Sequence, residues 1–146
     1  MIKVFYLICL ISSLPVIGQN LNYIQTCIKK QCFDARIADN PESRTKGLMG
    51  EVMLPENEGM LFIFPSEGTP KFWMKDTKIP LDILFVNDLD IVVYMVKNAQ
   101  PCKSNKCPVY KTTRRASKVL EINGGLSNKY NLHVGDPVQY FISDDS

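Results

Sequence analysis

Two carboxylates of this 146-residue chain lie inside apolar segments, where an ionised side chain is costly. Asp82 and Glu121 each stand between two aliphatic residues. A carboxylate in such surroundings must find a partner or shift its pKa. If the two converge in a pocket with Lys75 or Arg44, they would form a ligand site, or an acid–base pair when their pKa values are pushed apart. The alternatives are a structural ion pair or a position on the outward face of each strand.

Trp73 is the single tryptophan of the chain, and its flanking residues are Phe72 and Met74. An exposed Trp73 could stack on a sugar ring or a peptide, whereas a buried one would belong to the core. The polar turn at residues 75–78 places it near a strand end, where binding loops gather. We therefore predict a binding site that comprises Arg44, Trp73, Lys75, Asp82 and Glu121. No residue is assigned a catalytic role, and whether the protein is an enzyme stays open.

Other kinds of chemistry have less support. His133 is the single histidine, which excludes a multi-histidine metal site, and the methionines read as core residues rather than copper ligands. The pair Gly124-Gly125 reads as a turn, not as a phosphate-binding loop. The net charge of +2 argues against a protein that binds nucleic acid through charge alone. The basic run 111–118 reads as a solvated loop, with an anionic glycan or headgroup as the alternative ligand. We expect no metal and no cofactor.

The first 18 residues have the pattern of a signal peptide. Lys3 precedes an apolar run from Val4 to Leu14, which is too short to span a bilayer. We predict cleavage after Gly18 and a secreted or periplasmic location, with no transmembrane segment after cleavage. The alternatives are an uncleaved anchor or a buried strand.

Cleavage would remove Cys9 and leave four cysteines, an even number that indicates disulfides in an exported chain. They are Cys27, Cys32, Cys102 and Cys107, in two C-x4-C pairs. Three connectivities are possible, and a bond between Cys102 and Cys107 could close a tight turn. A four-thiolate zinc site and a redox pair are the alternatives. Two C-x4-C pairs that lie 70 residues apart in an oxidising compartment are a poor match to a zinc site, and redox motifs favour C-x-x-C.

The elements that must position these residues are mostly short strands. The segment Asp39–Glu42 is a helix start, and the helix would run from about Pro41 to Met49. Strands at 81–86 and 91–96 flank a turn and form the clearest hairpin. Because both are apolar on both faces, we expect them at the centre of a sheet. Further strands are expected at 32–38, 59–64, 71–74, 119–122 and 137–142, a second short helix at 126–132, and a loop at 99–117.

These elements predict one mainly β domain over residues 32–142, a sandwich or distorted barrel with one or two short helices. Residues 19–31 are expected to be a flexible lead-in and residues 143–146 a tail.

Several motifs occur in an order that resembles one known family. They are Arg44-x-x-Gly47-Leu48-Met49, Gly59-Met60-Leu61-Phe62-x-Phe64, Phe72-Trp73-Met74-Lys75-x-Thr77-x-Ile79-Pro80-Leu81-Asp82-Ile83-x-Phe85, Pro101-Cys102, Cys107-Pro108-x-Tyr110, Leu120-Glu121-x-x-Gly124 and Gly135-Asp136. Over residues 32–142 the chain resembles the family called "domain of unknown function 192". The resemblance implies a single mainly β domain, often exported, and implies no reaction.

The leading hypothesis is an exported β-domain that binds a ligand or partner in the cell envelope or the extracellular space. The partner would be a small molecule, a glycan or a protein. One alternative is an acid–base hydrolase or lyase that uses Asp82 and Glu121, which requires both carboxyl groups to face one pocket. The other alternative is a structural accessory protein.

Overall fold

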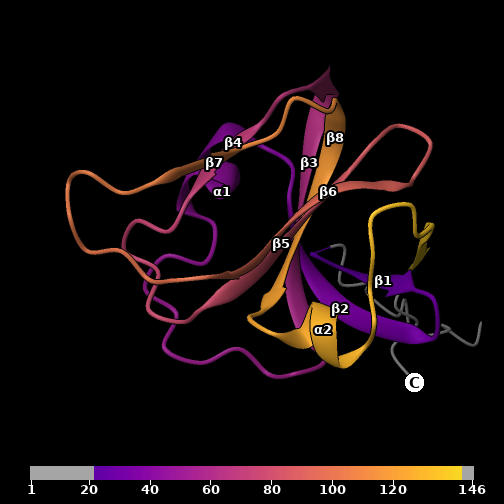
Figure 1. The fold of residues 1–146 in the computed structure, drawn as a ribbon, viewed down its shortest axis with the longest axis horizontal. Coiled ribbons are helices and arrows are strands. Elements are labelled where there is room, and N and C mark those ends of the chain that lie inside the picture. The colour runs from indigo at the N-terminus through magenta and orange to yellow at the C-terminus, as the bar shows by residue number, and fades with distance from the viewer. Residues whose placement is uncertain (1–21, 143–146) are drawn as a thin grey trace, which may run out of the picture.

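The computed structural model describes residues 22–142, so the expected signal segment and the C-terminal tail lie outside it. The described chain holds nine strands and two short helices (Figure 1). Within it, no helix is long and apolar enough to cross a membrane. In chain order the elements are β1 (Tyr23–Ile28), β2 (Gln31–Ala38), α1 (Pro41–Lys46), β3 (Glu58–Gly68), β4 (Lys71–Trp73), β5 (Leu81–Val86), β6 (Val92–Ala99), β7 (Val109–Lys111), β8 (Ala116–Asn123), α2 (Leu126–Lys129) and β9 (Val138–Ile142).

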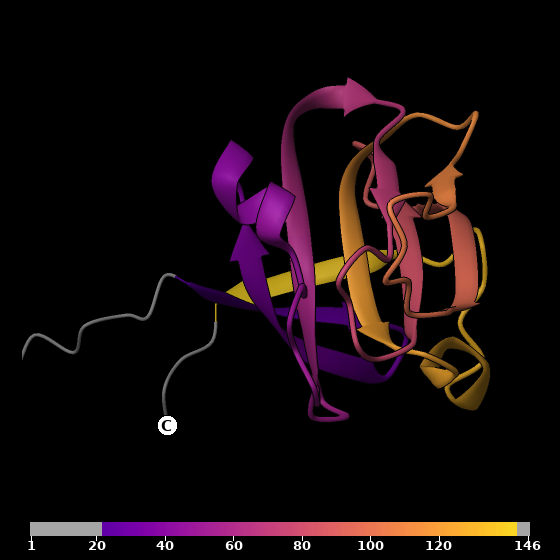
Figure 2. The ribbon, with the colours of Figure 1, turned by 90° about the vertical axis from the view of Figure 1, so that its left-hand side faces the viewer.

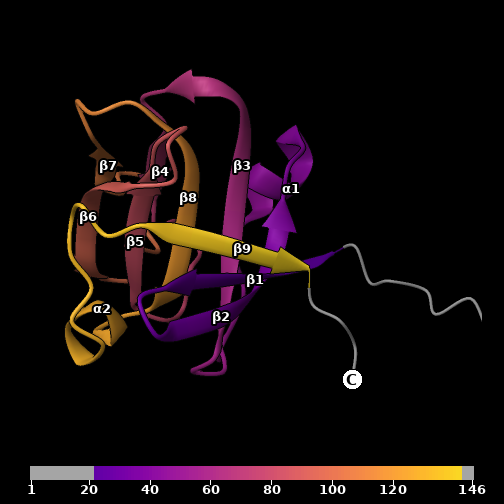
Figure 3. The same cartoon turned by 90° about the vertical axis from the view of Figure 1, so that its right-hand side faces the viewer.

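Seven strands form one mixed sheet in the order β6-β5-β8-β3-β2-β1-β9, and β4 and β7 form a small second sheet. The pair β2–β3 is parallel and the other pairs of the large sheet are antiparallel. A parallel pair needs a crossover connection, and here the crossover carries α1. Figure 3 shows β9 running alongside β1 at one edge of the sheet. The predicted mainly β fold with two short helices is confirmed, and the large sheet does not close into a barrel.

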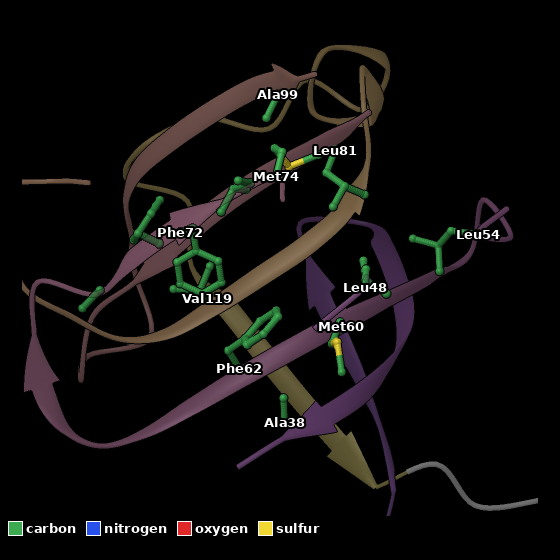
Figure 4. Close-up of a cluster of buried hydrophobic side chains, with 13 residues drawn as sticks. Ala38, Leu48, Leu54, Met60, Phe62, Phe72, Met74, Leu81, Ala99 and Val119 are labelled. Atoms are coloured by element: carbon green, nitrogen blue, oxygen red, sulfur yellow. The ribbon is translucent and has the colours of Figure 1, made fainter. Parts of the chain in front are cut away.

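The large sheet separates two apolar clusters because successive side chains of a strand point to opposite faces. On β5, Ile83 and Phe85 pack into one cluster, while Leu84 and Val86 pack into the other. All six residues of β5 are buried, as expected for a strand covered on both faces. The first cluster, drawn in Figure 4, lies under β4 and includes Phe62, Phe72, Met74 and Val119.

Three expectations differ from the structure. The strand at 91–96 is not central: β6 is an edge strand with several exposed residues. The apolar residues of a strand indicate which of its faces are covered, but they do not show whether it has a hydrogen-bonded neighbouring strand on one side or on both. Residues 23–28, expected within a flexible lead-in, form β1, which pairs with β2 and β9. The expected loop 99–117 and the basic run 111–118, expected as a solvated loop, contain β7 and the buried start of β8. The pairing of β7 with β4 depends on a contact distant in sequence.

The four cysteines lie in two local pairs at bonding distance. Cys27 and Cys32 face each other across the β1–β2 hairpin, with 4.0 Å between their Cα atoms. Cys102 and Cys107 close the loop before β7, with 5.8 Å between their Cα atoms. The pairs belong to separate elements, so the four thiolates do not gather into one zinc site.

Candidate functional site

A pocket of about 420 Å³ lies between α1 and β4. In Figures 2 and 3, α1 and β4 stand on either side of β3 and β8, which supply the base of the pocket. The volume lies in the range of small-molecule sites. The pocket is lined by Pro41, Arg44, Thr45, Lys46, Gly47, Leu48, Met49, Phe62, Phe64, Lys71, Phe72, Trp73, Thr77 and Glu121.

One wall is the helix α1, which begins at Pro41 as the sequence predicts but ends at Lys46, before the expected end at Met49. Asn40 caps the first turn: its side chain accepts from the backbone N–H of Ser43, the Ser43 hydroxyl accepts from the backbone N–H of Asn40, and Pro41 begins the helix. The cationic side chains of Arg44 and Lys46 lie in the last turn, where they suit the helix dipole. Both of these cations line the pocket.

Arg44 holds the helix against the sheet. Its Nη1 atom donates to the backbone oxygen of Asp39 at 2.6 Å and to that of Ile63, on β3, at 2.9 Å. The guanidinium carbon lies 5.3 Å from the centre of the Phe64 ring, within cation–π range. Because Arg44 bonds to carbonyl groups and not to a carboxylate, its positive charge is not neutralised by these contacts.

The helix ends at Gly47, which also lines the pocket. Its φ of +47° lies in the left-handed region that favours glycine. A Cβ atom at this position would lie 3.3 Å from the Cζ atom of Phe62. Glycine therefore ends the helix and leaves room above the aromatic base.

The opposite wall is β4, whose three residues alternate. Phe72 is buried and meets the rings of Phe62, Phe64 and Phe85 edge to face, with centroid distances of 4.9, 6.4 and 5.8 Å. Trp73 points outward, with 46% of its surface exposed, although it also lines the pocket. The alternative that Trp73 is a core residue is therefore wrong.

Glu121 of β8 lies at the base of the pocket and is only 4% exposed. Within residues 22–142, no hydrogen bond and no ion pair reaches its carboxyl group, and its strand neighbours on the same face are Met60 and Ile83. Burial without a partner raises the pKa of Glu121 to about 8. At neutral pH the group is therefore mostly a carboxylic acid, which can donate a hydrogen bond into the pocket.

Thr77 is a second buried polar residue of the lining, with 5% exposure. Its backbone N–H donates to the carbonyl of Met74, and in the described part of the chain its hydroxyl makes no hydrogen bond. A hydroxyl can donate and accept. Glu121 and Thr77 thus give the buried end of the pocket two polar side-chain groups that have no partner in the described chain.

Asp82 does not belong to this pocket. It pairs with Ile122 in the β5–β8 register, whereas Glu121 pairs with Ile83, so the two carboxylates lie on opposite faces of the sheet. Asp82 is fully buried and accepts from the backbone N–H groups of Asn98, Gly125 and Ser127 at 2.6, 3.0 and 2.8 Å. These hydrogen bonds cap α2 and join it to β6. The acid–base pair of Asp82 and Glu121 does not form.

The structure thus brings together three of the five predicted site residues: Arg44, Trp73 and Glu121. Lys75 lies beside the pocket, with its Nζ atom 5.4 Å from the centre of the Trp73 ring. Lys46, Lys71 and Thr77 were not predicted. Thr77 belongs to the long motif that resembles the family, and that motif was the one signal that could have identified it. No sequence signal distinguishes Lys46 and Lys71 from other lysines, since exposed lysines are common on protein surfaces.

Comparison with known proteins agrees with this fold. Residues 24–140 match the family model DUF192, described as "Uncharacterized ACR". The chain belongs to the domain of unknown function 192 family. This family member is similar to a protein of unknown function from Novosphingobium aromaticivorans, with 32% identity, a TM-score of 0.76, and 86% of this chain and 89% of that chain covered.

A second structure similar to this family member comes from Sinorhizobium meliloti and carries the provisional description "transcription regulator". The two share 26% identity with a TM-score of 0.74, over 81% of this chain and 92% of that chain. None of the curated proteins matches this family member.

Proposed function

We propose that this protein is an exported domain that binds a small organic ligand in the pocket between α1 and β4. One observation carries the proposal: the base of the pocket holds a buried carboxyl group, Glu121, that has no partner among residues 22–142. An isolated buried acid costs stability, and an apolar residue at this position would not. Groups with strongly shifted pKa values that sit in a cavity mark functional sites more often than other groups do.

The shape of the site favours a small molecule over a protein partner. Protein interfaces are broad and fairly flat, whereas a cavity of about 420 Å³ with aromatic walls and a few polar groups encloses a compact ligand. Trp73 supplies an exposed ring at the side of the pocket, and Glu121 and Thr77 supply polar groups at its base.

A location outside the cytoplasm is part of the proposal. The predicted signal segment and the two cysteine pairs at bonding distance support it, since disulfides persist in oxidising compartments. Mass spectrometry of the protein recovered from its native host tests this part. A chain that begins at or near Gln19 and contains no free thiol is the expected result. A full-length chain with free thiols would contradict it.

Binding is tested by thermal shift with metabolite and glycan libraries on the protein lacking residues 1–18. A ligand present at 100 times its Kd stabilises the folded state by about 2.7 kcal/mol, which raises the Tm by several degrees. The decisive variant is Thr45→Phe, because Thr45 is an exposed residue of α1 that lines the pocket. A phenylalanine there fills the cavity without disturbing the core.

The matched control is Glu42→Phe, on the same helix but outside the lining. A ligand of the pocket stabilises the wild type and Glu42→Phe and fails to stabilise Thr45→Phe. If no compound stabilises the wild type, or if every hit stabilises Thr45→Phe equally, the pocket is not a binding site.

A further inference from the structure

The three cations of the pocket lie above a base that carries no compensating negative charge. Arg44, Lys46 and Lys71 line the pocket, and the single acidic residue in the lining is Glu121. Among residues 22–142, no carboxylate forms an ion pair with any of the three cations. Because Glu121 keeps its proton at neutral pH, the empty pocket has an excess of positive charge.

Burial divides the polar groups between the two ends of the pocket. Lys46 and Lys71 are exposed and stand at its mouth, and Arg44 is half-buried. Glu121 and Thr77 are nearly completely buried and stand at the opposite end. A ligand that satisfies both ends is therefore charged at one end and carries a neutral hydrogen-bonding group at the other.

The middle of the pocket is aromatic. Phe62, Phe64, Phe72 and Trp73 all line it. Their rings offer flat, apolar surfaces, and flat rings pack well against such surfaces in offset or edge-to-face arrangements. The section between the charged mouth and the polar base thus suits an aromatic or similarly flat apolar body.

Resting on the proposed function, we infer that the ligand is an organic anion with a flat apolar body. Its carboxylate or phosphate group lies at the mouth between Arg44, Lys46 and Lys71. Its ring system lies between the phenylalanine rings and Trp73. A hydroxyl or carbonyl group at the far end bonds to the Glu121 carboxyl group and the Thr77 hydroxyl.

Isothermal titration calorimetry at pH 7 with four probes tests this inference. They are 2-naphthoate, 2-naphthyl phosphate, the uncharged 2-naphthamide and 6-hydroxy-2-naphthoate. We expect both anions to bind at least about tenfold more tightly than the amide, because a hydrogen-bonded charge at a partly buried site is worth more than a neutral contact. We expect 6-hydroxy-2-naphthoate to bind more tightly than 2-naphthoate because of its added hydroxyl group. The variants Glu121→Gln and Thr77→Val should reduce this difference in affinity. The ratio of the affinities for 2-naphthoate and 2-naphthyl phosphate tells whether the site prefers a carboxylate or a phosphate.

The charge contribution is isolated with Lys46→Gln/Lys71→Gln. The control is Lys30→Gln/Lys103→Gln, which removes the same charge at exposed positions outside the lining. The pocket variant is expected to lose about tenfold in affinity for 2-naphthoate and little for the amide, whereas the control keeps both affinities. Equal affinity for the acid and the amide, or equal losses in both double variants, would overturn the inference while pocket binding stands. If none of the four probes binds at millimolar concentration, the inference is also wrong, and the library screen on Thr45→Phe decides the proposed function separately.

Discussion

The carboxyl groups of Asp82 and Glu121 lie on opposite faces of the large sheet, although the two residues occupy neighbouring strands one register step apart. Asp82 is fully satisfied by three backbone N–H groups, and Glu121 has no partner in the described chain. Two carboxylates with similar neighbours in the sequence therefore differ in their hydrogen bonding and in the face of the sheet on which they lie. Asp82 joins α2 to β6, and Glu121 lines the pocket.

Asp82→Asn is expected to lower the free energy of unfolding by about 1–3 kcal/mol and to leave pocket binding unchanged. The asparagine amide places a donor where the carboxylate accepts a backbone N–H, so at least one bond at Asn98, Gly125 or Ser127 is lost. Urea unfolding and calorimetry with 2-naphthoate measure the two effects. Weaker ligand binding without a loss of stability would show that Asp82 serves the site after all.

Glu121→Gln is expected to stabilise the protein increasingly as the pH rises from 4.5 to 8. The pKa of Glu121 is raised from 4.5 to about 8, so between these values the unfolded chain has lost a proton that the folded chain keeps. The free energy of unfolding of the wild type therefore falls by about 1.4 kcal/mol per pH unit over this range from this group. Urea unfolding at several pH values measures the difference, and Glu42→Gln, an exposed change on α1, is the control. A difference that does not depend on pH would mean that Glu121 ionises normally.

The same titration predicts the pH dependence of ligand binding. Above about pH 8, Glu121 is ionised and places a negative charge at the base of the pocket, which opposes an anionic ligand. The other charged side chains that line the pocket are Arg44, Lys46 and Lys71. Affinity for 2-naphthoate should therefore fall between pH 7 and pH 9 in the wild type. In Glu121→Gln it should stay nearly constant, and a parallel decline in the two proteins would assign the effect to another group.

Arg44→Lys is expected to weaken binding about tenfold and to lower stability by about 1 kcal/mol. Lysine keeps the charge, but it lacks the planar guanidinium group, whose Nη1 atom bonds to the carbonyl groups of Asp39 and Ile63 and which lies over the Phe64 ring. Calorimetry and urea unfolding check both effects. The matched control is Arg114→Lys, at an exposed position outside the pocket, which should change neither value.

The two disulfides are expected to affect binding differently. Replacing either pair by serines should cost about 2 kcal/mol of stability in the chain-entropy model, because both close short loops of equal length. The backbone N–H of Cys102 donates to the carbonyl of Met74, and the N–H of Asp76 donates to that of Cys102. Loss of the pair Cys102 and Cys107 therefore loosens the segment that follows β4 and weakens binding, whereas loss of Cys27 and Cys32 does not. Equal affinities in the two double variants would contradict this.

Much of the fold could be predicted from local signals. The cap at Asn40, the hairpin around residues 87–90 and the buried strand β5 each depend on residues close in sequence, and each formed as expected. The errors concern elements whose partners are distant. The strand β1 is short and partly polar, and it is stabilised by pairing with β9, whose residues lie more than 100 positions away.

The site was predictable only in part for the same reason. Glu121 and Trp73 stand out because of their immediate neighbours, and Arg44 was expected as a charge partner of the two carboxylates. The face to which a carboxylate points depends on strand register, and register is set by the whole sheet. Lys46 and Lys71 become site residues because α1 and β4 line the same pocket, an arrangement that neither segment encodes alone.

The pairing of β1 with β9 has a consequence for how the chain folds. The first described strand finds its second neighbour only when the chain has been made as far as residue 142, and the contact Ile24–Ile142 joins the two ends of the described chain. Contacts between residues so far apart in sequence slow folding. The chain must lose the conformational entropy of closing the long loop before these contacts can stabilise it. The sheet therefore reaches its full width late, and a newly made chain stays open until its last strand is available.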